Sequence, residues 1–135
     1  RSALKHMKPG ASIINVSSIT TFYGEPELID YVTSKGAIIG FTRALSTNLA
    51  DKKIRVNAIA PGFFSTKQNA KLLFNEDGTP TARTGKILAA TPMGRFGEAE
   101  ELIGALLFLL CKDASSFVNG VVIPVDGGFS AYSGV

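Results

Sequence analysis

Three short apolar segments, separated by two helical segments, constrain the fold of this chain more than any other feature. Residues 11–17, 54–60 and 118–125 are rich in valine and isoleucine, which favour buried strands. Residues 31–50 and 98–111 are expected to be helices, and in the first Ile38, Phe41 and Leu45 recur at spacings of three and four. Strands joined by helices form parallel β-α-β units, so the sequence predicts an α/β fold with a doubly wound parallel sheet.

The predicted sheet is too thin to be a complete domain. Three strands and two main helices leave an exposed sheet edge, whereas parallel sheets are normally covered on both faces. The chain also begins at Arg1, inside what reads as the end of a helix before the Pro9-Gly10 break. We therefore expect residues 1–135 to be part of one larger domain, with further sequence upstream.

Composition and charge exclude several classes of protein. The chain is 45% hydrophobic and 19% charged, as in a globular domain, and its net charge of +3 comes from scattered basic residues rather than a nucleic-acid or membrane patch. No apolar run approaches the ~20 residues of a membrane span, and no spacing suggests a metal site. The single cysteine, Cys111, favours the cytoplasm and is expected to be a small buried residue, and His6 is expected on a helix surface.

Tyr31 and Lys35 are four residues apart at the start of a predicted helix, so both side chains lie on one face. A free tyrosine has a pKa of about 10, and a neighbouring ammonium favours the phenolate and lowers that pKa. Tyr31 could then exchange a proton with a substrate hydroxyl or carbonyl. The same spacing also occurs at the start of ordinary amphipathic helices, so the pair needs context from the rest of the chain.

Residues at the ends of the first two predicted strands supply that context. Ser18 follows the first strand, 13 residues before Tyr31, and can hydrogen-bond a substrate oxygen or be an ordinary loop serine. Pro61 and Gly62 end the second strand, where glycine lets a ligand approach the backbone. Thr66 follows, and either contacts the ligand or caps the next helix. Since ligands of open α/β sheets bind at the carboxyl ends of the strands, these residues mark the expected site.

Five segments carry a resemblance to a known family: IINVSS at 13–18, YVTSK at 31–35, NAIAPGFFST at 57–66, GRFG at 94–97 and VDGG at 125–128. In this order and spacing they resemble the short-chain dehydrogenase/reductase family. The resemblance runs along the whole chain and is more specific than any one motif. It implies a Rossmann-like sheet and an NAD(P)-dependent oxidoreductase.

The resemblance also implies roles for individual residues. By it, Ser18 orients the substrate carbonyl, Tyr31 donates or accepts the proton, and Lys35 assists Tyr31 and binds the nicotinamide ribose. Hydride passes between the nicotinamide of NAD or NADP and the carbon that bears the reacting oxygen. The cofactor is expected to contact Tyr31, Lys35, Pro61, Gly62, the backbone of Phe64, and Thr66.

The N-terminal half of the family has no counterpart in this sequence. The sequence contains no Gly-rich turn after a first strand, no acidic residue for the adenosine ribose, and no Asn-Asn-Ala-Gly segment or catalytic asparagine. The resemblance therefore implies that residues 1–135 are the C-terminal catalytic half of a single Rossmann-like domain. The active enzyme is then expected to be a longer parent protein rather than these residues alone.

The segment 63–91 corresponds to the variable substrate lid of the family. It carries Lys67, Lys71, Arg83 and Lys86, which could bind a carboxylate or simply form a solvated helix face. Residues 91–97 and 127–135 resemble sugar-acid members, so the expected substrate is a sugar acid of the fructuronate/mannonate type. The alternatives are a 3-oxoacyl-carrier-protein reductase and a non-enzymatic scaffold on the same fold.

The resemblance further implies a homo-oligomer, commonly a tetramer. The helix 31–50 would pack against the copy in a partner subunit. Phe129 and Tyr132, in the tail, would be buried between subunits. No nucleic-acid or membrane partner is expected, and the remaining partner is a small-molecule substrate.

Overall fold

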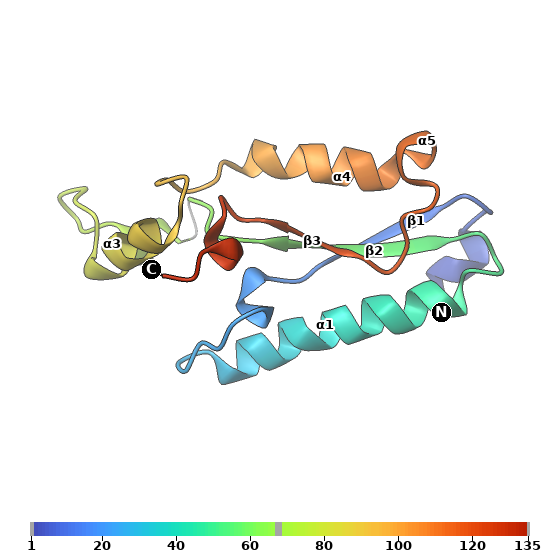
Figure 1. Cartoon of the computed structure of the whole chain (residues 1–135), viewed down its shortest axis with the longest axis horizontal. Coiled ribbons are helices and arrows are strands. Elements are labelled where there is room, and N and C mark those ends of the chain that lie inside the picture. Colours follow the sequence, from blue (N-terminus) through green and yellow to red (C-terminus); the bar gives the residue numbers. More distant parts are fainter. Residues whose placement is uncertain (1, 67–68, 135) are drawn as a thin grey trace.

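The computed structural model describes residues 2–66 and 69–134 and contains a three-stranded parallel sheet between helices (Figure 1). The strands β1 (Ser12–Val16), β2 (Arg55–Pro61) and β3 (Val122–Val125) lie in the order β1-β2-β3, and both neighbouring pairs are parallel. Helix α1 (Ile29–Asn48) covers one face of the sheet and α4 (Ile103–Leu110) covers the other. The predicted α/β fold with a parallel sheet is therefore confirmed.

Strand β2 forms the centre of the sheet. It pairs with β1 from Ser12↔Arg55 onward and with β3 through Pro61↔Val125. Every residue of β2 from Arg55 to Ala60 is buried, because this strand has a neighbouring strand on each side and helices cover both faces. A cluster of apolar side chains ties β2 to α1 and to the segment before β1: Leu49, Ile54 and Val56, with Leu4, Met7, Ala11, Ile13 and Leu45 packed against them.

The face that α1 turns to the sheet differs from the predicted one. Leu45 and Leu49 do join the core, but Phe41 is 56% exposed while Thr42 and Ser46 are buried. The Nδ2 of Asn15 on β1 donates to Thr42 Oγ1 at 2.9 Å. Small polar residues let the helix approach the strands closely, and a search for apolar spacing cannot detect such a contact.

Several element boundaries also differ from the predicted ones. The helix expected at 98–111 is a 3-10 helix, η3 (Ala99–Leu102), followed by α4 and the short α5 (Lys112–Ser115). The last strand begins at Val122 rather than at 118, because Gly120 turns with φ +77° and its N–H donates to Val56 O. The side chain of Asn57 holds this turn by donating to Val118 O and accepting from Val121 N.

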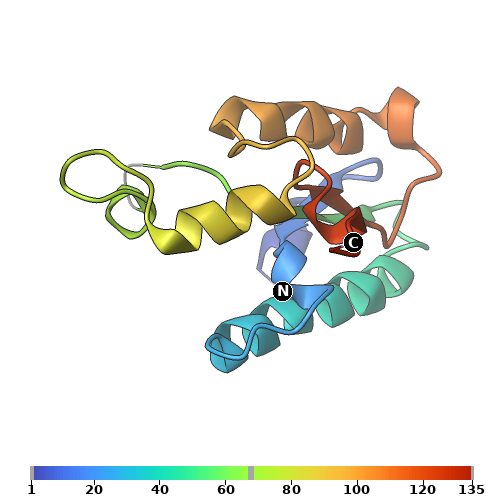
Figure 2. The same ribbon diagram turned by 60° about the vertical axis from the view of Figure 1, so that its left-hand side comes forward.

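The described part of the segment 63–91, called the lid below, contains two short helices around a turn: α2 (Ala70–Leu73) and α3 (Ala82–Ala90). The strand arrows point toward α3, so the lid extends beyond the carboxyl ends of the strands (Figures 1 and 2). Three 3-10 turns complete the fold: η1 (Ala3–His6), η2 (Ile19–Thr21) and η4 (Phe129–Ala131). His6 is exposed in η1, as expected.

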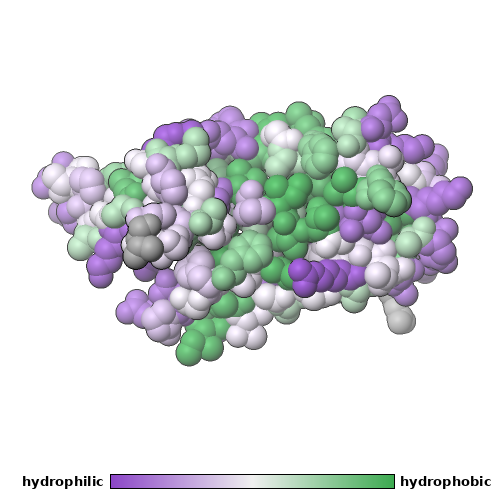
Figure 3. All heavy atoms as spheres, viewed as in Figure 1, coloured by the Kyte–Doolittle hydropathy of each residue, from purple (hydrophilic) through white to green (hydrophobic). Residues whose placement is uncertain are grey.

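A hydrophobic surface remains uncovered on the outside of the structure. Residues of α4 contribute much of it, since Ile103, Leu107 and Leu110 are 48%, 60% and 53% exposed. Figure 3 shows apolar atoms gathered over the region between α4 and α1. Cys111 at the end of α4 is exposed, so the expectation of a buried cysteine was wrong. Within the described ranges, no helix has the length and hydropathy needed to cross a membrane.

Candidate active site at the carboxyl ends of the strands

Tyr31 and Lys35 lie together in the first two turns of α1, on one face as predicted. The Nζ of Lys35 lies 5.7 Å from the centroid of the Tyr31 ring. It donates to the carbonyl of Val16 at the end of β1, at 3.2 Å, and Ser17 Oγ donates to the carbonyl of Lys35 at 2.9 Å. These two bonds fix α1 to the strand end. Tyr31 remains 40% exposed, so a ligand at the strand ends can reach its ring.

Ser18 directly follows this strand end and is 6% exposed. Its Oγ accepts hydrogen bonds from the backbone N–H of Thr20 at 3.3 Å and from Thr20 Oγ1 at 3.0 Å. A serine hydroxyl has two acceptor sites and one donor hydrogen. Because Thr20 occupies both acceptor sites, the hydroxyl hydrogen of Ser18 is left to donate to a ligand oxygen.

Thr20 is a site residue that the sequence reasoning missed. Its bonds to Ser18 form the hydroxyl-capped turn that opens η2. Serine and threonine often make such local side-chain bonds, and the pattern Ser-x-Thr at 18–20 was the available signal.

Gly62 follows the end of β2 and lies against β3. Its N–H donates to Val125 O at 2.9 Å, and a Cβ added at Gly62 would lie 2.6 Å from Asp126 Cβ and 2.7 Å from Asp126 Cα. Glycine after Pro61 is therefore explained by the packing of two neighbouring strand ends. The sequence reasoning expected a different cause, the approach of a ligand to the backbone.

Phe64 and Thr66 extend from this strand end toward the lid. Phe64 pairs in parallel with Gly97 and lines a cavity of about 200 Å³ beside Asp126 and Gly127. Thr66 is exposed, and its Oγ1 accepts from Asn69 N at 3.3 Å, while Asn69 Oδ1 accepts from Thr66 N at 2.9 Å. These two bonds join Thr66 to Asn69, the residue that precedes α2.

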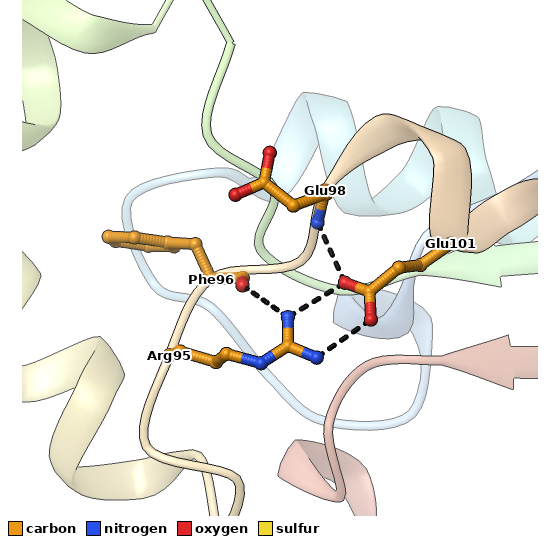
Figure 4. A network of polar contacts seen from close by, with 4 residues as sticks. All are labelled: Arg95, Phe96, Glu98 and Glu101. Atoms are coloured by element: carbon orange, nitrogen blue, oxygen red, sulfur yellow. Dashed lines mark hydrogen bonds and ion pairs between the residues drawn. The ribbon is translucent and has the colours of Figure 1, made fainter.

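An exposed ion pair fixes the far wall of the same cavity (Figure 4). Both guanidinium nitrogens of Arg95 donate to the carboxylate of Glu101 at 2.7 Å, and Arg95 Nη1 also donates to Phe96 O. Glu101 in addition accepts from the backbone N–H of Glu98. Hydrogen bonds from Arg95, then from the Glu98 backbone, lower the pKa of Glu101 to about 2. This network joins the segment that follows the lid to η3.

The lid cations do not act as one group. Arg83 and Lys86 of α3 line a second cavity, of about 420 Å³, whereas Lys71 of α2 lines a separate depression. Lys67 lies outside the described residues. In the second cavity, the ring centroid of Phe129 is 5.3 Å from that of Tyr23 and 5.1 Å from that of Phe63.

In the tail, Phe129 packs against rings of its own chain, and Tyr132 is 45% exposed. Among the described residues, no group of three or more His, Cys, Asp or Glu side chains is placed to hold a metal ion.

The site residues fit the nicotinamide-ribose end of a dinucleotide. A lysine ammonium has three donor hydrogens, and the bond to Val16 O uses one, which leaves two for ribose hydroxyls. The phenol of Tyr31 is exposed beside it. A parallel α/β sheet with such donors at its carboxyl edge is typical of nucleotide-binding α/β proteins.

Comparison with known proteins agrees with that class. A family profile described as enoyl-(acyl carrier protein) reductase matches residues 1–130. The chain belongs to the short-chain dehydrogenase/reductase family, as the sequence motifs predicted.

Three relatives illustrate the similarity. A Haemophilus influenzae structure with bound NAD, provisionally named a D-mannonate oxidoreductase, is 56% identical with a TM-score of 0.93 and covers 98% of this chain and 48% of its own. A Burkholderia cenocepacia gluconate 5-dehydrogenase, solved in complex with NADP and tartrate, is 34% identical with a TM-score of 0.79. The match covers 90% of this chain and 46% of that enzyme. A Thermotoga maritima 3-oxoacyl-[acyl-carrier-protein] reductase is 44% identical over 117 residues. These residues are 87% of this chain and 44% of the reductase. The chain thus spans less than half the length of each relative.

Proposed function

We propose that these residues form the catalytic half of an NAD(P)-dependent oxidoreductase that interconverts a carbonyl and a secondary alcohol. The observation that carries the proposal is the arrangement at the end of β1. There Lys35 is fixed beside the Tyr31 ring by the Val16 carbonyl, and Ser18 follows with its hydroxyl hydrogen uncommitted. Donors aimed at the position where charge develops on oxygen are what carbonyl reduction requires.

Each residue then has a separate task. Ser18 donates its hydrogen bond to the substrate oxygen, and Tyr31 gives or takes the proton of that oxygen. Lys35 holds Tyr31 in place and donates its remaining hydrogens to the cofactor ribose. The bound nicotinamide supplies or accepts the hydride. Pro61, Gly62, the backbone of Phe64 and Thr66 form the cofactor side of the site. The relatives solved with NAD or NADP support this assignment.

We further propose that residues 1–135 are the C-terminal part of a larger Rossmann-like domain. Helix α4 is apolar on all sides, and such helices are buried on all sides in complete domains. Arg55 at the start of β2 is 7% exposed, and its two terminal nitrogens have no hydrogen-bond partner among the described residues. A buried guanidinium without a partner is costly, so a partner from outside these residues is expected.

The proposed substrate is a sugar acid of the fructuronate/mannonate type. The gluconate 5-dehydrogenase relative was solved with tartrate, a hydroxylated carboxylate, and the Haemophilus influenzae relative carries the mannonate name. A 3-oxoacyl-carrier-protein reductase is the second candidate, and the Thermotoga maritima relative favours it. A non-enzymatic scaffold is the third, although the intact Tyr31–Lys35 pair speaks against it.

An absorbance assay separates these candidates. The complete enzyme is mixed with fructuronate and NADH, or with fructuronate and NADPH, and loss of the reduced-nicotinamide absorbance is followed. Rapid loss is expected, and it also identifies the preferred cofactor. No loss with fructuronate but loss with a 3-oxoacyl substrate would favour the second candidate. No loss with any keto substrate would favour the scaffold.

We also propose that the enzyme is a homo-oligomer, commonly a tetramer in this family, and acts in the cytoplasm. The large apolar residues Ile29 and Phe41 of α1 are 73% and 56% exposed, which suits a helix that packs against a partner copy. Light scattering of the complete enzyme should give about four times the subunit mass. A monomeric mass would contradict the tetramer.

A further inference from the structure

The cavity of about 420 Å³ between α3 and the loop that precedes α1 has walls of opposite charge. Arg83 and Lys86, three residues apart on α3, form one wall. Glu25 and Glu27 form the facing wall. The ion pair Arg95–Glu101 is the one found within the described ranges. Among those residues, Arg83 and Lys86 therefore have no carboxylate within 4.0 Å.

Arg83 lies where the dipole of its own helix disfavours a positive charge. It is the second residue of α3, and a cation in the first turn of a helix is opposed by the helix dipole. Nothing in the stability of α3 therefore accounts for a positive charge there. An anion in the cavity would account for it, since it would bind both cations at once.

Aromatic residues line the cavity, and one of them carries a buried hydroxyl without a hydrogen-bond partner among the described residues. The rings of Tyr23 and Phe63 both pack on Phe129, and all three line the cavity. The Tyr23 hydroxyl is buried and finds no hydrogen-bond partner among the described residues. Burial, and then the charge of Glu25, raises the pKa of Tyr23 to about 12, so the group stays protonated and can donate near neutral pH.

The cavity lies next to one of the strand ends at the candidate active site. Tyr23 lies on the segment between Ser18 and Tyr31. Phe63, which comes directly after Gly62, lines both this cavity and the smaller one at the strand ends. A ligand that fills the larger cavity would therefore lie beside the strand end that carries Gly62.

We propose that this cavity selects hydroxylated carboxylates, with the ligand carboxylate on Arg83 and Lys86 and its hydroxyls on Glu25 and Glu27. The inference rests on the proposed function and adds the residues that set its substrate class. Carboxylates accept strong hydrogen bonds from guanidinium and ammonium groups, and carboxylate side chains accept from hydroxyls. Aromatic rings provide apolar contact for the carbon skeleton. A pantetheine thioester offers no carboxylate for the positive wall.

Calorimetry on the complete enzyme tests the selection without turnover. Mannonate and gluconate are titrated into the enzyme saturated with NADH or NADPH, in which no hydride acceptor is present. Mannitol and glucitol are the matched neutral ligands. The double variant Arg83→Gln/Lys86→Gln should bind the two acids about 100-fold more weakly, because it loses two charge-assisted bonds worth roughly tenfold each. Its weak binding of the alditols should not change.

Two further variants control for unrelated effects. Lys71→Gln removes a lid cation that does not line this cavity and should bind the acids like the wild type. Lys86→Arg keeps the charge and should retain most of the affinity. Glutamine is a good helix former, so α3 should persist, and an unchanged Tm confirms this.

Three results would overturn the inference: equal acid affinity in the double variant and the wild type, equal affinity of the wild type for acids and alditols, or no binding of either acid. The proposed function fails by a different observation, the absence of nicotinamide oxidation with any keto substrate. An enzyme that reduces ketones without preferring acids would keep the function and lose this inference.

Discussion

Two regions of the molecule are stabilised by different kinds of hydrogen bond. One is the corner, where β1 meets α1, and the other is the part of the lid at residues 69–91. In the corner, side chains bond to the backbone of the sheet: Lys35 to Val16 O, and Ser17 to the carbonyl of Lys35. In the lid, α2 and α3 bond mainly to each other, through Thr81 N to Leu73 O at 2.9 Å and Thr84 Oγ1 to Leu73 O. The corner is part of the frame, whereas the lid is a small unit folded on itself.

This difference suggests separate tasks: proton transfer in the corner and substrate recognition in the lid. Groups that transfer a proton must be held within a fraction of an ångström, and strands and long helices provide that precision. Groups that recognise a substrate can sit on a segment whose sequence changes without disturbing the sheet. Changes in the corner should therefore act on turnover, and changes in the lid should act on ligand choice.

Tyr31→Phe gives the largest expected effect and tests the corner most directly. It removes only the phenolic hydroxyl, so proton transfer is lost while the ring remains beside Lys35. Turnover of the complete enzyme should fall by about 10²–10⁴-fold, the usual contribution of a general acid or base. Binding of NADH or NADPH, followed by calorimetry, should stay largely intact. Near-normal turnover would contradict the assigned role of Tyr31.

Replacing Gly62, at the strand ends of the frame, and Gly85, in the lid, by alanine should change stability in opposite directions. At Gly62 the new Cβ meets the backbone of Asp126, which cannot move without separating β2 from β3, so the variant should lose about 1–3 kcal/mol. At Gly85, in the middle of α3, no atom lies within 4 Å of the new Cβ, and alanine should add about 0.5–1 kcal/mol. Denaturant unfolding measures both. Equal and small effects would show that the strand ends are less tightly packed than described.

The sequence predicted the frame better than the details within it. The β-branched segments marked all three strands, because a buried parallel strand is recognisable from its own residues. The contact face of α1 was missed at Thr42 and Ser46, since its close packing depends on polar partners such as Asn15 that come from another element. The start of β3 was missed because the turn at Gly120 is fixed by Asn57, far away in the sequence.

The candidate site shows the same limit. Tyr31 and Lys35 share a helix face that their spacing alone determines. Which lid cations face the cavity could not be predicted, because this depends on how α3 packs against the loop at 23–27. The packing reason for a glycine at position 62 could not be predicted either, because Asp126, which it contacts, follows a different strand.

Thr20→Val should produce a moderate effect confined to the corner. Valine keeps the branched shape but removes the Oγ1 that donates to Ser18 Oγ, so the serine hydroxyl is held less firmly. The kcat of the complete enzyme should fall about fivefold, which corresponds to one ordinary hydrogen bond of about 1 kcal/mol. Thr21→Val is the matched control, because Thr21 Oγ1 donates to the carbonyl of Ser18 rather than to its hydroxyl. An equal loss of kcat in both variants would assign Thr20 a merely structural role.

Glu101→Gln gives the smallest expected effect and concerns the joint between the two regions. The folded-state pKa of Glu101 is about 2, below its ordinary value of 4.5, so the charged carboxylate stabilises the folded state above pH 4.5. That contribution disappears as the pH falls from about 4.5 to about 2. The Tm of Glu101→Gln should thus lie slightly below that of the wild type at pH 7, and the gap should close on acidification. Glu100→Gln removes a neighbouring exposed charge with no ion pair among the described residues, and its Tm difference should show no such closing. If the two variants respond alike to pH, the Arg95–Glu101 pair does not stabilise the folded state in the way described.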